Sequence, residues 1–307
     1  MANYVIQATE STIKRMEQYY NSYITGHLPA GALFVAKKNG CTITAYRSGK
    51  VLFQGKEAEK EAQIWSIPAS QQPTLKEQNT RSSRLSIVSA VGSDEVGTGD
   101  YFGPIVVVAA YVAKEQISSL AKMGVKDSKQ LTDEAICRLA PLLMEKIEYE
   151  QAVLSNHTYN QWQQNGMPQT KIKALLHNEA IKKLVQKLAP ASPEAIIIDQ
   201  FIERDRYFLY LEGERHVIRD HVYCIPKAET VHIAVAAASI IARYLFLHEM
   251  DKLSEQMGMN LPKGAGEHVD RAAASLIQTH GEASLEACAK LHFANTEKAK
   301  QIAMKFK

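Results

Sequence analysis

The sequence predicts an α/β domain with a mixed sheet, preceded by a small α+β domain. Three observations lead to this fold class. Strand-like apolar runs alternate with amphipathic helical segments from residue 85 onward, a helix–meander–helix pattern precedes them, and a stretch rich in Pro, Gln, Ser and Thr separates the two parts. We therefore expect an N-terminal domain over residues 1–65, a linker over 66–84 and a second domain over 85–307.

The N-terminal domain is expected to hold an antiparallel meander between two helices. Apolar and aromatic residues fall at helical spacing within residues 9–24. Residues 31–55 consist of short β-rich runs separated by Asn-Gly and Ser-Gly pairs, which favour hairpin turns. A second helix over residues 56–65 closes the unit, so that one face of the sheet stays open.

The second domain alternates strands and helices. A glycine-rich connection joins its first two strand-like runs, as in a hairpin, and Thr132 is placed to cap the first long helix. A later apolar run is typical of a central strand buried on both faces. The expected strands cover residues 85–95, 103–112 and 194–201, and the expected helices cover 132–147, 170–188 and 234–250.

Composition indicates a soluble globular protein of a reducing compartment. Hydrophobic residues make up 46% and charged residues 22% of the chain. The four cysteines are scattered without a CxxC pair, which argues against a zinc site and a disulfide framework. The N-terminus lacks the pattern of a secretory signal, and the apolar run Ile105–Val112 is far too short to span a bilayer. We therefore expect a cytoplasmic protein that does not insert into membranes.

Positive charge is concentrated near the N-terminus. Residues 1–85 contain 11 Lys and Arg against 6 Glu and no Asp, whereas the remaining residues contain 25 against 27 acidic residues. A basic appendage on a nearly neutral body indicates a polyanionic partner, although a surplus of this size is also common on solvated surfaces.

Three carboxylates stand at the ends of strand-like runs. Asp94 and Glu95 follow the first run, and Asp199 follows the apolar run Ile196–Ile198. A buried carboxylate is costly unless it is paired, hydrogen-bonded or bound to a metal. Adjacent side chains on a strand point to opposite faces, so the pair meets at one point only if the backbone twists or a ligand gathers it. The pattern predicts a divalent-metal site, but the pair with its following glycines also fits a polar hairpin turn.

Glu229 directly precedes a helix that begins with small residues. Small side chains at Ala236–Ser239 allow this helix to pack closely on the sheet, which would bring Glu229 near the strand ends. An acidic residue at this position also complements the helix dipole without any further role. A set of four oxygen ligands favours Mg²⁺ or Mn²⁺ over zinc.

The segment "VKDSKQL" offers two cations and a hydroxyl before a helix. Lys126, Ser128 and Lys129 are candidates for holding phosphates, and the same residues also fit a solvated turn.

Together these motifs resemble those of bacterial ribonuclease HIII, a type 2 ribonuclease H. The segments that carry the resemblance are, in order, "SDEVGTGDYFGPIVVVAAYV", "VKDSKQLT", "IIIDQF", "PKAETVHIAVAAASIIARY" and "AKLHFANTEKA". They cover most of residues 85–300. The sister family, ribonuclease HII, usually has Asp at the position of Glu229 and Gly-Arg-Gly at Gly97-Thr98-Gly99, so both differences favour ribonuclease HIII.

The resemblance implies a fold, an activity and a metal site. It implies an RNase H-like catalytic domain, with an N-terminal substrate-binding domain related in fold to the TATA-box-binding protein. Asp94, Glu95, Asp199 and Glu229 are then the catalytic residues that bind two Mg²⁺ or Mn²⁺ ions. The implied reaction is endonucleolytic hydrolysis of the RNA strand of an RNA/DNA hybrid, which leaves 5′-phosphate and 3′-hydroxyl ends.

The resemblance also implies contacts to the substrate. The backbone at Gly97, Thr98 and Gly99 is expected to reach 2′-hydroxyl groups in the minor groove, which distinguish RNA from DNA. Contacts to backbone phosphates are expected from Lys126, Ser128, Lys129 and Lys227.

Other functions remain open at this point. The chain could incise DNA at single embedded ribonucleotides, as ribonuclease HII does, or bind nucleic acid without cleaving it through its basic N-terminal domain. An exonuclease of the DEDD type fits less well, because its opening motif separates Asp and Glu by one residue. We expect a monomer, because one chain contains the whole set of acids, and an RNA/DNA hybrid as its partner.

Overall fold

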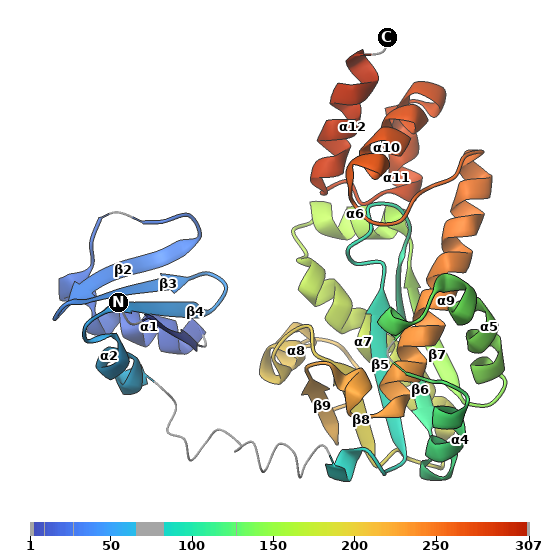
Figure 1. The fold of residues 1–307 in the computed structure, drawn as a ribbon, viewed down its shortest axis with the longest axis horizontal. Helices are drawn as coiled ribbons and strands as arrows, with labels where there is room; N and C mark the ends of the chain where they lie inside the picture. Colours follow the sequence, from blue (N-terminus) through green and yellow to red (C-terminus); the bar gives the residue numbers. More distant parts are fainter. Residues whose placement is uncertain (1–2, 9, 27, 66–82, 127, 306–307) are drawn as a thin grey trace. The chain divides into compact units, whose positions relative to one another are not determined.

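The chain forms two compact units, Met1–Asn79 and Thr80–Lys307. The computed structural model describes residues 3–8, 10–26, 28–65, 83–126 and 128–305 (Figure 1). Apart from Ser83 and Arg84, the linker expected at 66–84 lies outside the described residues. Each unit has its own hydrophobic core.

The N-terminal unit is a four-stranded antiparallel sheet in the order β1-β4-β3-β2. Helices α1 (Glu10–Tyr19) and α2 (Ala58–Trp65) lie on one side of the sheet, as expected (Figure 1). The sequence pattern does not predict β1, a five-residue strand that pairs with β4. The strands are β1 (Asn3–Gln7), β2 (Ala32–Lys38), β3 (Cys41–Tyr46) and β4 (Lys50–Gly55).

The second unit contains a five-stranded mixed sheet in the order β7-β6-β5-β8-β9. The central strand β5 pairs antiparallel with β6, which confirms the predicted hairpin, and parallel with β8. The predicted α/β architecture with a mixed sheet is therefore confirmed. The strands are β5 (Ala90–Val96), β6 (Ile105–Val112), β7 (Tyr149–Leu154), β8 (Ala195–Asp199) and β9 (Val222–Ile225).

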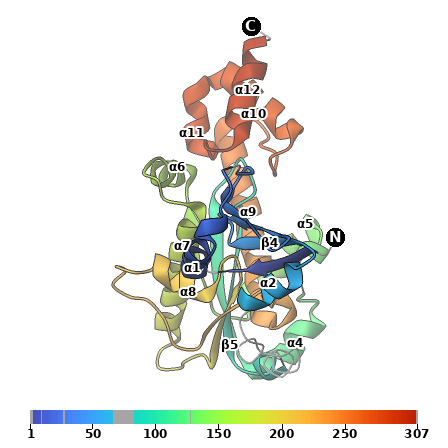
Figure 2. The same ribbon diagram turned by 90° about the vertical axis from the view of Figure 1, so that its left-hand side faces the viewer.

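Helices cover both faces of this sheet. On one face α9 (Ile233–Met257) packs against β5 and β6 and is flanked by α4 (Ile117–Lys122) and α5 (Asp133–Met144). On the other face lie α7 (Gln169–Leu188) and α8 (Arg204–Tyr210), and Figure 2 shows α7 and α9 on opposite sides of β5. Thr132 caps α5 as expected, because its Oγ1 accepts a hydrogen bond from the Ala135 N–H at 3.3 Å.

A group of helices at one end of the second unit was not anticipated from the sequence pattern (Figure 1). The helices from residue 267 onward bury apolar side chains in the same core as α9, together with Tyr101 and Phe102 from the glycine-rich connection. The earlier helix of the group, over residues 156–164, instead buries Tyr159 in the core on the α7 side of the sheet. The group consists of α6 (Asn156–Gln164), α10 (Glu267–His280), α11 (Leu285–Cys288) and α12 (Ala294–Lys305).

Helix α9 approaches β5 more closely than ordinary side chains would permit. A Cβ atom added at Gly92 would lie 2.2 Å from the carbonyl carbon of Ala234. Ala236, Ala237 and Ala238 are buried at the same contact, so the expected close packing of the helix on the sheet is confirmed. The absence of a side chain at Gly92 therefore sets the distance between α9 and the strand that carries Asp94.

By length and hydropathy, α9 is the one helix among the described residues that could cross a membrane. In this protein 61% of its most apolar window is buried. That burial is what the core helix of a folded domain requires.

Candidate metal centre

The predicted acids gather at one edge of the central sheet. β5 and β8 run parallel, with Ser93 paired to Ile198, so that Asp94 and Asp199 follow side by side where the strands end. Ligands commonly bind at the carboxyl ends of parallel strands. Glu229 lies in the short 3₁₀ turn Ala228–Thr230 before α9. The Ala228 N–H donates to Asp199 Oδ1 at 2.9 Å and so ties this turn to the strand end.

Asp94 points toward α9. The hydroxyl of Ser239 on that helix favours the ionised form of Asp94, whose Oδ1 accepts from the Glu95 N–H at 2.8 Å. Burial raises the pKa of Asp94 to about 7, and the charges of Glu95 and Asp199 add to the rise. The Asp94 carboxyl is thus a half-buried acid near other negative charges, and an added cation would relieve this repulsion.

Glu95 points to the opposite face, toward α7. Lys173 Nζ donates to Glu95 Oε1 at 2.7 Å, and His177 Nε2 lies 2.9 Å from Glu95 Oε2. The Ser93 Oγ in turn lies 2.7 Å from His177 Nδ1. Burial opposes ionisation of Glu95, but the hydrogen bonds and charges of His177 and Lys173 outweigh it and hold the pKa of Glu95 below its usual range.

The alternation of side chains along β5 therefore separates the two neighbouring acids. Among the described residues, no three His, Cys, Asp or Glu side chains converge closely enough to hold a metal ion. The donors nevertheless suit a hard divalent cation, because they are carboxylate oxygens and the half-buried Asp94 experiences the negative charges of Glu95 and Asp199. Asp94, Glu95, Asp199 and Glu229 are the residues that would hold such an ion.

Ser128 does not lie where a phosphate contact requires it. Its side chain is buried, and its Oγ lies 2.8 Å from the Oγ of Ser239, the residue that contacts Asp94. Arg243 folds the segment in this way, because its Nη1 donates to the carbonyls of Ser128 at 2.6 Å and Leu131 at 3.0 Å. Ser128 therefore acts on Asp94 indirectly, through Ser239.

The three lysines expected at phosphates lie on the surface. Lys126 and Lys129 are exposed on either side of the buried Ser128. Lys227 is also exposed and adopts a left-handed backbone conformation with φ 53° directly before the turn that holds Asp199. Their positions are compatible with contacts to a polyanion.

The glycine-rich connection between β5 and β6 is shaped by its glycines. Gly97 has φ +95°, and a Cβ there would lie 2.2 Å from the Pro104 carbonyl oxygen, so no other residue fits. Gly99 is exposed, and a Cβ there would have no atom within 4 Å. Gln169 of α7 donates to the Thr98 carbonyl oxygen at 3.0 Å and fixes the peptide between the two glycines. The connection therefore presents bare backbone at Gly99, whereas Gly97 is buried at the turn.

A buried lysine from the C-terminal segment holds the far side of this connection. Lys290 is fully buried, and its ammonium donates to the carbonyl oxygens of Asp100, at 2.9 Å, and Gly103. Burial lowers the pKa of Lys290 to about 7. The sequence gives no sign of this contact, because 187 residues separate Lys290 from Gly103.

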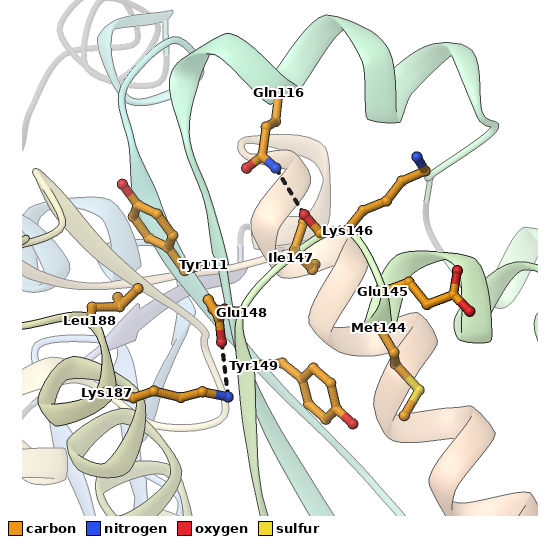
Figure 3. Close-up of a pocket in the computed structure, with 10 residues that line it drawn as sticks. All are labelled: Tyr111, Gln116, Met144, Glu145, Lys146, Ile147, Glu148, Tyr149, Lys187 and Leu188. Carbon is orange, nitrogen blue, oxygen red and sulfur yellow. Dashed lines mark hydrogen bonds and ion pairs between the residues drawn. The ribbon is translucent and has the colours of Figure 1, made fainter.

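A surface pocket in this unit lies away from the acids (Figure 3). Its lining includes Tyr111 near the end of β6, Tyr149 at the start of β7 and Lys187, which pairs with Glu148 at 2.9 Å. Since β5 and β6 are antiparallel, the end of β6 lies beside the beginning of β5, at the opposite end of the sheet from Asp94. None of the residues predicted to act in catalysis or binding lines this pocket.

The second unit is similar to the type 2 ribonucleases H. A family model described as Ribonuclease HII matches residues 91–296, and a domain of unknown function (DUF3378) matches residues 3–78. The crystal structure of ribonuclease H2 from Pyrococcus horikoshii OT3 is 22% identical, covers 71% of this chain and 100% of its own, and has a TM-score of 0.57, a likeness of fold. The second unit thus has the fold of the type 2 ribonucleases H.

Relatives that align with nearly the whole chain identify the family within this class. Ribonuclease HIII of Geobacillus sp. (strain WCH70) is 68% identical over 99% of this chain and 100% of its own, and that of Bacillus subtilis (strain 168) is 50% identical over 99% of each. The crystal structure of Bst-RNase HIII in complex with Mn²⁺ is 56% identical, covers 99% of this chain and 100% of its own, and has a TM-score of 0.73. The chain therefore belongs to the ribonuclease HIII family.

The raised pKa of Asp94 predicts a pH dependence of stability in the metal-free protein. The unfolded chain loses this proton near the ordinary pKa of 3.8, whereas the folded chain keeps it to about pH 7. The stabilising contribution is therefore complete below the unfolded value and is lost as pH rises through the folded value. We expect Asp94→Asn, which cannot ionise, to be more stable than the wild type at pH 8 by about 1–3 kcal/mol, with little difference at pH 4.

Urea unfolding in EDTA at the two pH values measures this difference, and groups common to both proteins cancel from it. A stability difference that does not change with pH would show that Asp94 ionises normally in the fold.

Proposed function

We propose that this protein is an endonuclease that hydrolyses the RNA strand of RNA/DNA hybrids with Mg²⁺ or Mn²⁺, leaving 5′-phosphate and 3′-hydroxyl ends. The observation that carries the proposal is the pair of parallel strand ends that brings Asp94 beside Asp199, with the pKa of Asp94 raised to about 7 by burial and by the charges of Glu95 and Asp199. Membership of the ribonuclease HIII family supports the substrate and the reaction.

Asp94, Glu95, Asp199 and Glu229 are the proposed metal ligands and catalytic residues. Divalent ions bound there would supply an activated water and compensate the charge on the leaving 3′-oxygen. The chain itself prepares the site. Ser239 of α9 favours the ionised form of Asp94, and the Ala228 N–H holds Asp199. Lys173 and His177 of α7 hold Glu95.

The glycine-rich connection is proposed to select RNA. A 2′-hydroxyl both donates and accepts hydrogen bonds, so it can pair with backbone groups of Gly97, Thr98 and Gly99. Of these residues Gly99 is exposed, Thr98 is half-buried and Gly97 is buried. The Gln169 contact keeps the Thr98 peptide in one orientation. Lys126, Lys129 and Lys227 would then contact phosphates around the acids, whereas the buried Ser128 acts through Ser239.

The N-terminal unit is proposed to bind the duplex with the face of its sheet that α1 and α2 leave uncovered. The strand registers align apolar and hydroxyl side chains across this face, where Val5 is exposed, Leu52 is half-buried and Thr44 is buried. Lys37 and Lys50 alternate onto the same face. A broad sheet with such side chains and a few cations suits a minor groove. Residues 1–65 thus form the proposed substrate-binding domain.

Lys38 points away from this face. Its ammonium pairs with Glu61 at 3.2 Å and lies 4.6 Å from the centre of the Tyr19 ring, on the side covered by the helices. It therefore supports the fold of the unit, and the proposed duplex contacts belong to its neighbour Lys37.

We also propose that the protein acts as a monomer in the cytoplasm. All four proposed ligands come from one chain, so no second copy is needed to complete the site. The four cysteines are free, which is the state that a reducing compartment maintains.

Cleavage assays test the proposed function directly. With Mg²⁺, the intact protein is expected to cut the RNA strand of a uniform RNA/DNA hybrid and to act weakly on a DNA duplex with one embedded ribonucleotide. EDTA and Asp94→Asn should each abolish both activities, because they remove the metal or its ligand. Efficient incision at the single ribonucleotide would indicate a ribonuclease HII-like activity, and no cleavage of either substrate would leave only nucleic-acid binding.

Charge removal on the open sheet face tests the N-terminal domain. The double variant Lys37→Gln, Lys50→Gln is expected to raise KM for the hybrid severalfold at physiological salt and to reduce the salt slope of log K by up to about 2, while kcat stays unchanged. Lys14→Gln, Lys60→Gln removes the same charge from α1 and α2 and serves as the matched control. Equal effects of the two double variants would show that only net charge matters and refute the open face as the binding surface.

A further inference from the structure

Both oxygens of the Glu95 carboxylate are already engaged. Oε1 accepts from Lys173 at 2.7 Å and Oε2 lies 2.9 Å from His177. The two partners sit at positions i and i+4 of α7, so one face of that helix supplies both. The side chain of Glu95 is only 12% exposed, which leaves it little solvent as a substitute. If Glu95 is to bind a metal ion, either Lys173 or His177 must release the Glu95 oxygen that it contacts.

His177 is more tightly constrained by its surroundings than Lys173. The His177 side chain is fully buried, its Nδ1 lies 2.7 Å from Ser93 Oγ, and its ring stacks on Phe201 at 5.1 Å. Lys173 has a long flexible side chain that is 13% exposed, and Glu95 is its only ion-pair partner among the described residues. Lys173 is therefore the partner that can move.

The Lys173 ammonium also has a second place of contact. It lies 4.3 Å from the centre of the Phe201 ring, and Phe201 follows Asp199 by two residues. A cation–π contact of this kind persists when the ion pair is broken. Moving away from Glu95 would thus not leave the ammonium without a partner.

We propose that Lys173 is a positioning residue that serves as the internal counterion of Glu95 in the metal-free protein. It yields Oε1 when a divalent cation binds, while His177 keeps hold of Oε2. The inference rests on the proposed role of Glu95 as a metal ligand. It adds that the metal affinity of this site is set by competition between a divalent cation and a built-in ammonium ion.

The competition predicts that removing Lys173 strengthens metal binding, whereas a substitution that merely disturbs the fold would weaken it. Removing the ammonium frees Oε1 and removes a positive charge that repels the incoming cation, so metal binding should become tighter. A lysine that only supported the fold would give looser or unchanged binding when removed. Lys173→Gln tests the same point with a polar side chain, in case Lys173→Met perturbs packing.

Mn²⁺ titration followed by electron paramagnetic resonance of the free ion gives the dissociation constant without any cleavage assay. We expect Lys173→Met and Lys173→Gln to bind Mn²⁺ about three- to tenfold more tightly than the wild type. Lys173→Arg keeps the charge and should remain within about twofold of the wild type. Lys171→Met removes a lysine from the same helix two residues away and should leave the constant unchanged.

Glu95→Gln separates the two possible failures. If this variant binds Mn²⁺ as the wild type does, Glu95 is not a ligand and the proposed metal site is wrong at that residue. If Glu95→Gln weakens binding but neither Lys173→Met nor Lys173→Gln tightens it, the metal role stands and the counterion role of Lys173 is overturned. Tightening by Lys171→Met to the same extent would likewise overturn it.

Discussion

Two neighbouring carboxylates on the central strand project to opposite faces of the sheet, and the rest of the site depends on this separation. Asp94 faces α9, where Ser239 contacts it, and Glu95 faces α7, where Lys173 and His177 hold it. The separation has unequal electrostatic consequences. The pKa of Asp94 is raised to about 7, chiefly by burial, whereas that of Glu95 is held below its usual range by its two partners. At neutral pH the same strand thus carries Asp94, which is close to the midpoint of its titration, and Glu95, which is ionised.

The close packing around β5 makes this arrangement rigid. Gly92 lets the backbone of α9 contact the strand, which brings Ser239 to Asp94. Beyond the acids, Gly97 turns the chain in a conformation that only glycine adopts without strain. Lys290 then fixes the far part of the connection through two backbone carbonyls. Residues from distant parts of the sequence therefore hold the acids and the bare backbone in fixed relation.

Much of this could be predicted from the sequence, because the strands and the acids carry local signals. Asp94 and Asp199 each follow an apolar strand-like run, and the small residues of α9 correctly indicate a close approach to the sheet. Strand β1 carries no such signal, since its five residues become a strand by pairing with β4 some 45 residues later in the chain. Ser128 was expected at a phosphate because it stands between lysines, but Arg243 turns the segment so that the hydroxyl faces inward.

The contacts of Glu95 with Lys173 and His177 could not be predicted from local sequence patterns. Lys173 and His177 share a helix face by their spacing, yet nothing in that spacing tells which residue the face meets 78 or more positions away. Likewise, Glu229 in its sequence context fits a helix-dipole role as well as a metal role, and only the bond from the adjacent Ala228 N–H to Asp199 brings its turn to the strand end. Contacts between distant segments, rather than motifs, decide these roles.

Binding of a divalent ion is expected to bring together carboxylates that the strand itself directs to opposite faces. Crystals of the protein soaked in Mn²⁺ and measured at the manganese absorption edge test this most directly. We expect an anomalous peak about 2 Å from oxygens of Asp94 and Asp199, with Glu95 Oε1 turned from Lys173 toward the ion. A peak elsewhere, or a peak at Asp94 and Asp199 with Glu95 still paired to Lys173 through Oε1, would contradict this expectation.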